Sequence, residues 1–314
     1  MIDIRTAAPF VRRFQGRILV LKVGGACLSH AGTRRRLAED IAVVHTLGAA
    51  VVVLHGAGPQ VDQLQRRLGE EPRKVAGRRV TTPAALSALR QATQELNADL
   101  AAAISAAGAP ALGLSAASAG VLEARRRPPL ATPEGVLDFG FVGDLTSVNA
   151  LPLLQLLEGG IIPVLGPPAG DGQGGFLNVN ADLAAAHVAV ALEAAKLVLI
   201  TQTPGILLDA EDPRSLVSAL SLEQLGALEH SGVLKDGMAV KAAALRFALE
   251  RGVERTHVVS GLAADGLLGE LYTTHGTGTL VTRLPEVEGE LPAHELEPAR
   301  RPEARLEGSL AGQP

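Results

Sequence analysis

The sequence predicts an α/β protein, a three-layer αβα sandwich with a central, mainly parallel sheet. Short apolar runs alternate along the chain with longer stretches of helical periodicity, which is typical of parallel strands joined by crossover helices. Of the 314 residues, 47% are hydrophobic and only 2% are aromatic, so a large core must be built from Leu, Val, Ile and Ala. A chain of this length is expected to form one extended domain or two lobes.

The elements follow from their own patterns. The apolar run ILVLK indicates the first strand, and RRRLAEDIAVVHTLG has the period of a helix that ends at a glycine. In the helix expected at residues 56–69, Val61, Leu64 and Leu68 fall on one face. In chain order, strands are expected at 18–22, 51–55, 110–115, 161–165, 196–201 and 256–260, and helices at 34–48, 56–69, 88–108, 182–195 and 239–252.

Three segments lack these patterns. GPPAGDGQGG, residues 166–175, is the expected boundary between two lobes at 18–165 and 175–284. RRRPPLATPEG, residues 125–135, is expected to be an exposed loop or hairpin whose arginines are solvated. Residues 285–314 are rich in Pro, Glu and Arg with little apolar periodicity, and we expect a disordered tail there.

Composition argues against several classes of function. The net charge is −4 and aromatic residues are scarce, so a nucleic-acid partner is not expected. The only cysteine, Cys27, suits a reducing cytoplasm. No apolar run reaches the roughly 18–20 residues of a membrane span, and the N-terminus lacks the apolar core of a signal peptide. We therefore expect a cytoplasmic protein without a membrane partner.

The stretch ILVLKVGGACLSH places Lys22 at the tip of a buried strand and Gly24 and Gly25 just after it. One interpretation is a snorkelling lysine followed by a tight turn. The other is a phosphate cradle, in which glycines let backbone N–H groups approach an anion and the lysine adds positive charge.

A second glycine turn, HGAGPQ at residues 55–60, lies between the strand VVVL and a helix. The start of a helix after such a turn can bind an anion, although an ordinary turn explains one occurrence as well. Neither turn has the pattern G-x-x-x-x-G-K-[ST], and neither fits G-x-G-x-x-G with an acidic residue further on. A nicotinamide-dependent enzyme is therefore disfavoured.

Two further elements carry candidate residues. In FLNVNAD, Asn178, Asn180 and Asp182 recur at alternate positions, which in an extended segment would point them the same way, whereas capping the next helix needs only one of them. In KDGMAVKAAAL, Lys241 sits near a helix start, where a cation is mildly unfavourable unless a phosphate binds there. A solvated surface lysine is the alternative.

In series, these elements resemble the amino acid kinases and, within them, the acetylglutamate kinases. The resemblance covers roughly residues 8–283 and rests on six motifs in the order of that family: KVGG (22–25), HGAGPQ (55–60), GRRVT (77–81), NVNAD (178–182), TQTPGI (201–206) and GMAVK (237–241). It implies the amino acid kinase fold, with an acceptor lobe at 18–165 and a nucleotide-binding lobe at 175–284. The implied activity moves the ATP γ-phosphate to the γ-carboxylate of N-acetyl-L-glutamate in arginine biosynthesis.

The resemblance also implies roles for residues. Lys22 and Lys241 would flank the transferring phosphoryl group, and Asp182 would hold both lysines. Arg79 and Asn178 would bind the acceptor's α-carboxylate, near the turn formed by Gly56, Ala57 and Gly58. The nucleotide and its phosphates would contact Gly24, Gly25, Thr201, Gly205, Ile206, Gly237 and Met238. ATP and Mg²⁺ would be required, and no resident metal is expected.

Some positions depart from the family pattern. Ala57 replaces a glycine, which resembles the kinase part of bifunctional acetylglutamate synthase/kinases, and Gln202 replaces a common aspartate. Residues 1–17 resemble the N-terminal helical extension of arginine-inhibited hexameric members, so a homo-oligomer (dimer or hexamer) is expected. His257, Glu270 and Gly276 match the arginine site of those members, which makes L-arginine a candidate effector.

Two other functions stay open. The first is the same fold acting on another carboxylate acceptor, such as carbamate or a different amino acid. The second is a kinase-like regulatory module that binds arginine or nucleotide without turnover.

Overall fold

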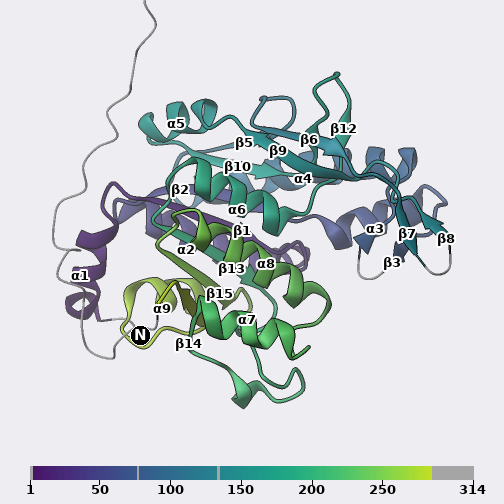
Figure 1. The fold of residues 1–314 in the computed structure, drawn as a ribbon. Helices are drawn as coiled ribbons and strands as arrows, with labels where there is room; N and C mark the ends of the chain where they lie inside the picture. The colour runs from purple at the N-terminus through teal and green to yellow at the C-terminus, as the bar shows by residue number, and fades with distance from the viewer. Residues whose placement is uncertain (1–2, 76–77, 133–134, 285–314) are drawn as a thin grey trace, which may run out of the picture.

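The computed structural model describes residues 3–75, 78–132 and 135–284. Its centre is an eight-stranded sheet in which, among the described residues, β15 and β16 are the one neighbouring pair that is antiparallel, so β14 and β16 run opposite to the other six strands. Figure 1 shows this sheet crossing the molecule between layers of helices. In spatial order the strands are β14 (Ala219–Ser221), β16 (Thr279–Thr282), β15 (Arg255–Ser260), β13 (Lys196–Thr201), β1 (Ile18–Val23), β2 (Ala50–His55), β10 (Ile162–Gly166) and β5 (Ala111–Ser115).

Helices cover both faces of the sheet, which confirms the predicted αβα sandwich. The first face packs against α1 (Ile4–Phe14), α2 (Ala31–Thr46), α4 (Pro83–Ala106) and α9 (Gly266–Tyr272), with Val61 of α3 (Gly58–Arg67). The second face packs against α5 (Leu151–Glu158), α6 (Ala181–Ala191), α7 (Leu222–His230) and α8 (Asp236–Glu250). In Figure 1, α6 and α8 lie in front of the sheet.

The two cores follow from side-chain alternation along the central strand β1. Leu19, Leu21 and Val23 belong to the core of the first face, whereas Val20 belongs to the core of the second. Lys22 has the same parity as Val20. Its side chain is therefore directed to the face that α6 and α8 cover.

A second, four-stranded sheet was not expected from the sequence. It is formed by β12 (Phe176–Leu177), β11 (Ala169–Gly170), β6 (Leu122–Arg126) and β9 (Gly143–Val148). Two of its strands have only two residues each, and the other two mix polar and apolar residues, so none has the apolar run that marked the inner strands. Figure 1 shows this sheet above α6.

Two hairpins complete the architecture. The first pairs β3 (Lys74–Val75) with β4 (Arg78–Arg79), and the second pairs β7 (Leu130–Thr132) with β8 (Gly135–Leu137). In the second hairpin, the exposed Leu130 and Val136 face solvent.

The second hairpin overlaps the segment 125–135, for which a loop or hairpin was expected, but Arg125 and Arg126 belong to β6 of the second sheet. The expectation that the arginines of this segment are only solvated is wrong for Arg126 and Arg127, which form ion pairs with Asp138 and Asp144.

The expected lobe boundary at 166–175 contains β11 and leads into β12, and the central sheet is continuous from β14 to β5. The division into two lobes stays a prediction. The expected tail at 285–314 lies outside the described residues. None of the described helices is both long enough and apolar enough to cross a bilayer.

Candidate active site

The carboxyl ends of three neighbouring strands form the edge where the site lies. β1 sits between β13 and β2, with Lys22 in register with Leu199 and Leu54. All three strands run parallel, so the turns that follow β1 and β2 and the segment that follows β13 emerge side by side. Ligands of open α/β sheets bind at this kind of edge.

Asp182 joins the two candidate lysines. Its Oδ1 lies 2.8 Å from Lys22 Nζ, and its Oδ2 accepts a hydrogen bond of 3.2 Å from Lys241 Nζ. The side chains of Lys22 and Asp182 are each only 7% exposed, and that of Lys241 is 15% exposed. The structure thus brings together, in one buried cluster, three charged groups from β1, α6 and α8.

Asp182 reaches the lysines because another residue caps its helix. The Asn180 side chain is the N-cap of α6 and accepts hydrogen bonds from the amides of Asp182 and Leu183. The expectation that Asn178, Asn180 and Asp182 point the same way is wrong, because the extended backbone ends where α6 begins at Ala181. In the first turn of α6 the Asp182 carboxylate also faces the positive end of the helix dipole.

The cluster carries an excess of positive charge. Burial disfavours ionisation of Asp182, but the Coulombic attraction of Lys22 and Lys241 outweighs burial and holds its pKa below the ordinary value. The carboxylate is therefore ionised at neutral pH, and it offsets only one of the two ammonium charges. The remaining charge, in a site shielded from water, favours an anion.

The two glycine turns touch each other beside this cluster. A Cβ added at Gly25 would lie 2.7 Å from the Gly56 carbonyl oxygen, so only glycine permits the observed approach. The amides of Gly24 and Gly56 donate to Ile200 and Val23 and extend the sheet ladder. Contrary to expectation, these two amides face the sheet. Among the described residues, the amides of Gly25, Ala57 and Gly58 have no acceptor and remain as donors for a ligand.

His55, at the end of β2, supports the second turn from within the core. Its Nε2 lies 2.7 Å from Asn97 Oδ1, while Asn97 Nδ2 donates to the Leu114 carbonyl at 2.8 Å. Burial lowers the pKa of His55, so its ring is neutral at pH 7. Asn97 was not expected from the sequence. The only available signal was a polar residue on the apolar face of a long helix.

Arg79 and Asn178 lie on adjacent segments linked by Thr81. Asn178 Nδ2 donates to Thr81 Oγ1 at 3.0 Å, and Thr81 follows Arg79 by two residues in the chain. The side chain of Arg79 is 9% exposed, and its guanidinium is held by Asp62, by Gln65 and by the Gly58 carbonyl. Sequence reasoning missed Asp62 and Gln65.

Of the residues expected to contact the nucleotide, some lie at the ends of elements and others are packed in the protein interior. Thr201 ends β13, and Gly237 and Met238 lie in the first turn of α8 beside the same edge. Gly205 is packed so closely that an added Cβ would lie 2.6 Å from Thr279 Oγ1. The side chain of Ile206 is fully buried in the second core, so only its backbone could contact a ligand.

The arginine-site candidates form a second buried cluster, on the first face. His257 Nδ1 lies 2.7 Å from Glu270 Oε1, and His257 Nε2 lies 2.8 Å from Lys196 Nζ. Burial, reinforced by Lys196, lowers the pKa of His257 to about 4, so neutral His257 donates to Glu270 and accepts from the ammonium. Gly276 adjoins this carboxylate, since a Cβ there would lie 2.8 Å from Glu270 Oε2. Lys196 was not expected.

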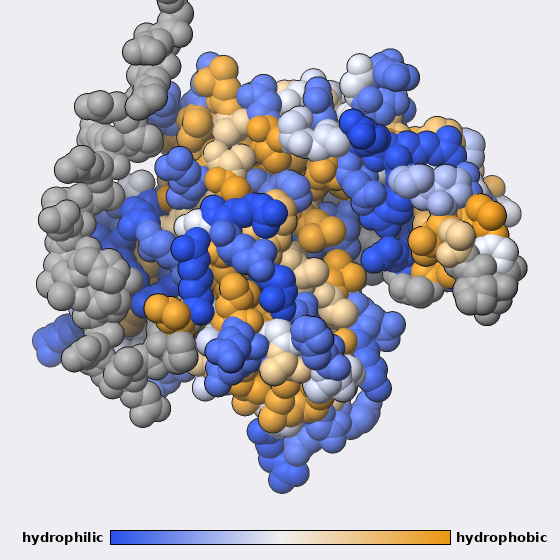
Figure 2. Space-filling model, viewed as in Figure 1, coloured by the Kyte–Doolittle hydropathy of each residue, from blue (hydrophilic) through white to orange (hydrophobic). Residues whose placement is uncertain are grey.

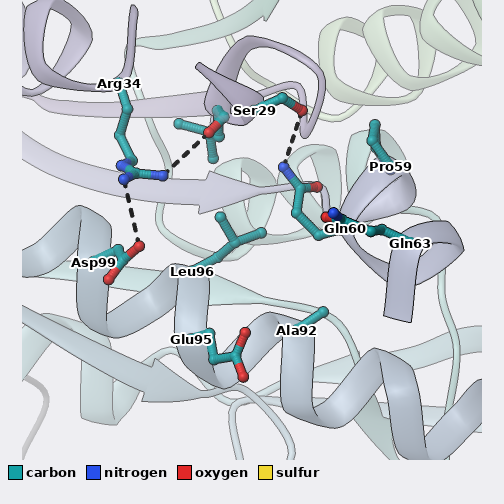
Figure 3. Close-up of a pocket in the computed structure, with 10 residues that line it drawn as sticks. Ser29, Arg34, Pro59, Gln60, Gln63, Ala92, Glu95, Leu96 and Asp99 are labelled. Carbon is teal, nitrogen blue, oxygen red and sulfur yellow. Dashed lines mark hydrogen bonds and ion pairs between the residues drawn. The ribbon is translucent and has the colours of Figure 1, made fainter. Parts of the chain in front are cut away.

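A cavity of about 200 Å³ lies behind the glycine turns rather than at the lysines. Figure 3 shows Arg34, Gln60, Leu96 and Asp99 among the side chains that line it. Gln60 Nε2 donates to the Gly25 carbonyl at 2.9 Å and to Ser29 Oγ at 3.2 Å, so it braces the first turn. Viewed from outside, polar and apolar residues are interspersed over the face that α6 and α8 cover (Figure 2).

Within the described residues, no group of three or more His, Cys, Asp or Glu side chains could hold a metal ion. The site therefore consists of two ammonium groups, one carboxylate, free backbone amides and a guanidinium. These groups bind and stabilise anions.

Comparison with known proteins gives consistent relationships. Residues 17–260 match the amino acid kinase family. The chain is 42% identical to the acetylglutamate kinase of Myxococcus xanthus over 287 residues, which cover 89% of this chain and 93% of that protein. It is 36% identical over 280 residues to the acetylglutamate kinase of Carboxydothermus hydrogenoformans, covering 88% of this chain and 95% of that one.

Solved structures agree on the fold. The N-acetylglutamate synthase of Neisseria gonorrhoeae, complexed with coenzyme A and N-acetyl-glutamate, superposes with a TM-score of 0.78 at 29% identity. The match covers 90% of this chain but only 63% of the synthase chain. The carbamate kinase of Giardia lamblia bound to AMP-PNP has a TM-score of 0.63 at 17% identity, covering 85% of this chain and 99% of that one, and shares the fold.

Proposed function

The chain belongs to the amino acid kinase family, and on this premise we propose that it transfers the γ-phosphoryl group of ATP to the side-chain carboxylate of N-acetyl-L-glutamate, a step of arginine biosynthesis. The observation that carries the proposal is the buried cluster in which Asp182 contacts both Lys22 and Lys241. Relatives of nearly the same length, which are named acetylglutamate kinases, support the choice of acceptor.

The chemistry needs no general base. The acceptor carboxylate is ionised at neutral pH, so its oxygen attacks the γ-phosphorus directly while the bond to the β–γ bridging oxygen breaks and ADP leaves. The obstacle is repulsion between two anions and the charge on the transferring group. The ammonium groups of Lys22 and Lys241 would neutralise that charge, and Asp182 would keep both in position.

The free amides supply a second set of donors. Those of Gly25, Ala57 and Gly58 lie at the turns next to Lys22, where they can donate to phosphate or carboxylate oxygens without reorganisation. Replacing the family's glycine by Ala57 leaves this amide in place, because the N–H belongs to the backbone.

Arg79 and Asn178 would bind the acceptor's α-carboxylate, which supports a free amino-acid derivative over carbamate. ATP would enter as its Mg²⁺ complex, and its base and ribose would contact the segment from Thr201 and the start of α8, at Gly237 and Met238. The reducing cytoplasm suggested by the lone Cys27 is the compartment we propose.

The proposal is tested by ADP release from MgATP with and without N-acetyl-L-glutamate. We expect release to depend on that acceptor and to be weaker with carbamate or glutamate. Lys22→Ala and Lys241→Ala should fold normally and lose about 10²–10³-fold in kcat, the size of one lost charge-stabilising donor. Arg35→Ala, which changes an exposed residue on α2, is the control. Near-normal turnover in both lysine variants, or nucleotide binding without ADP release, would contradict the proposal.

We also propose L-arginine as an effector that binds at the Lys196–His257–Glu270 cluster. The cluster adjoins α1, since Lys196 Nζ lies 5.2 Å from the Phe14 ring centre, and a synthase that shares the fold was crystallised with L-arginine. Arginine should inhibit turnover of the wild type and lose that effect in Glu270→Gln, which removes the charge that would pair with a guanidinium. A flat titration of the wild type would refute feedback. Light scattering would test the expected dimer or hexamer.

A further inference from the structure

We propose that Asp62, which contacts Arg79, occupies its carboxylate-binding face until the acceptor binds, and then yields that place to the acceptor's α-carboxylate while it remains paired with Lys74. The inference rests on the function proposed above, in which Arg79 binds that carboxylate. It adds the group that the acceptor displaces and the residue that receives it.

The donor count of Arg79 requires a displacement. A guanidinium has five N–H groups and binds a carboxylate best through two adjacent, parallel ones. Nη2 uses both of its hydrogens, one toward Asp62 and one toward the Gly58 carbonyl at 3.1 Å. Each of the two bidentate edges of the guanidinium includes one Nη2 hydrogen. A second carboxylate therefore cannot form two hydrogen bonds to either edge of the guanidinium until Asp62 or the Gly58 carbonyl leaves Nη2.

Of the three partners that Arg79 has in the described part of the chain, two are fixed. The Gly58 carbonyl belongs to the backbone of α3. Gln65 is 1% exposed, and its Nε2 donates to Glu70 Oε2 at 3.2 Å, so its oxygen must face Arg79. Glu70 in turn accepts from Thr82 Oγ1 at 2.6 Å, which holds the chain of contacts in place. Asp62 is the partner that can be exchanged.

Asp62 has a second cation ready to keep it paired. Lys74 Nζ lies 2.8 Å from Asp62 Oδ2, and Lys74 and Arg79 are cross-strand neighbours in the β3–β4 hairpin. Like charges directly opposite each other destabilise a strand pair, and Asp62 offsets both. Burial opposes its ionisation, but the hydrogen bonds from Lys74 and Arg79 prevail and keep its pKa below the ordinary value. Asp62 is thus a carboxylate that competes with an acceptor.

The exchange conserves charge pairing. Before binding, Asp62 is shared between two cations, and after binding Arg79 holds the acceptor while Asp62 keeps Lys74. Because the Lys74 side chain is 48% exposed and that of Asp62 is 16% exposed, the remaining pair can relax toward water. The cost to the acceptor is the Arg79–Asp62 contact that it must break, which weakens its binding.

The test is Asp62→Asn, with KM and kcat for N-acetyl-L-glutamate measured beside the wild type. We expect KM to fall about three- to tenfold, the size of one partly buried charge-assisted contact, with kcat little changed. Glu71→Gln is the matched control, because it removes one charge from the exposed Arg66–Glu71 pair nearby without touching Arg79. A KM that rises or stays constant in Asp62→Asn would overturn the inference.

Lys74→Met provides the second arm. Without Lys74, Arg79 is the one cation among the described residues that still pairs with Asp62, so KM should rise, and this effect should vanish in the Asp62→Asn background. An equal effect of Lys74→Met in both backgrounds would show that Lys74 acts on the acceptor directly and would also overturn the inference. If the wild type itself shows no acceptor-dependent ADP release, the proposed function fails instead, so the two failures are distinguishable.

Discussion

Lys22 and Lys241 come from distant parts of the chain, yet one carboxylate contacts both. Asn180 caps the N-terminus of α6, so the Asp182 carboxylate is not needed as a cap and can contact both lysines. An ionised Asp182 without its lysines would be an uncompensated buried charge, and the lysines without Asp182 would repel each other. Asp182 therefore pairs with both buried lysines, and the net positive charge that remains favours an anion.

Asp40, on α2, gives a pH-dependent prediction at the same scale. Burial raises its pKa to about 6, with Asp265 and Glu39 adding to the effect and Arg36 opposing it. Because the folded-state pKa lies above the ordinary value, an ionised Asp40 destabilises the fold above pH 6, and this penalty disappears as pH falls toward 4. Asp40→Asn should therefore raise the free energy of unfolding at pH 8 by up to about 3 kcal/mol.

Denaturant unfolding of wild type and Asp40→Asn at pH 4, 6 and 8 would measure this gain, with the exposed Glu95→Gln on α4 as control. A gain that is the same at every pH would argue against a titrating Asp40.

At the scale of elements, the two glycine turns act as one unit. The turn after β1 and the turn after β2 meet at Gly25 and Gly56, where a Cβ on Gly25 would lie 2.7 Å from the Gly56 carbonyl oxygen. Gln60, at the start of α3, donates a hydrogen bond to the Gly25 carbonyl and so links the first turn to α3. The parallel register of β1 and β2 brings these turns level. Free amides beside Lys22 are the result.

Gly25→Ala should therefore cost about 1–3 kcal/mol of stability and lower turnover, because the added methyl group forces the turns apart. Gly32→Ala, in the first turn of α2, meets nothing within 4 Å and should leave stability equal or slightly higher. Guanidinium unfolding and ADP release on both variants measure this. Equal midpoints for the two variants would mean that the turns are free to separate.

At the scale of the whole molecule, one continuous sheet runs through both halves of the chain that the sequence predicts to be separate lobes. β1 pairs along its length with β13 on one side and β2 on the other, so the strand that bears Lys22 belongs to both halves. The helices α6 and α8 pack against each other over this junction. Lys22, Asp182 and Lys241, the residues proposed to be catalytic, thus come from one continuous sheet and two helices that pack on it.

This continuity predicts that residues 18–284 unfold in one transition rather than as two lobes. The chain has no Trp and a single Tyr, Tyr272, which packs edge-on against Phe14 of α1 at 5.8 Å. Its fluorescence reports on that corner, whereas far-UV circular dichroism reports on the whole chain. The two curves should coincide in denaturant. Separate midpoints would support two independently folding lobes.

The sequence by itself determined the fold class, six strands of the central sheet and the helices α2, α3, α4, α6 and α8, because alternation in a strand and helical periodicity are local patterns that a buried face imposes on its own segment. It also marked Lys22, Asp182 and Lys241 as charged residues at the ends of elements. The short second sheet, the strands β14 and β16 and the helices α5, α7 and α9 were missed, since these elements are short and their local patterns are weak.

Only the tertiary structure decided which groups meet. The contacts of Arg79 with Asp62, of His55 with Asn97 and of His257 with Lys196 join segments far apart in the chain, and no local pattern records them. A polar group buried by folding needs a partner, but the order of strands in the sheet and the crossing of the helices determine which residue is near enough to be that partner.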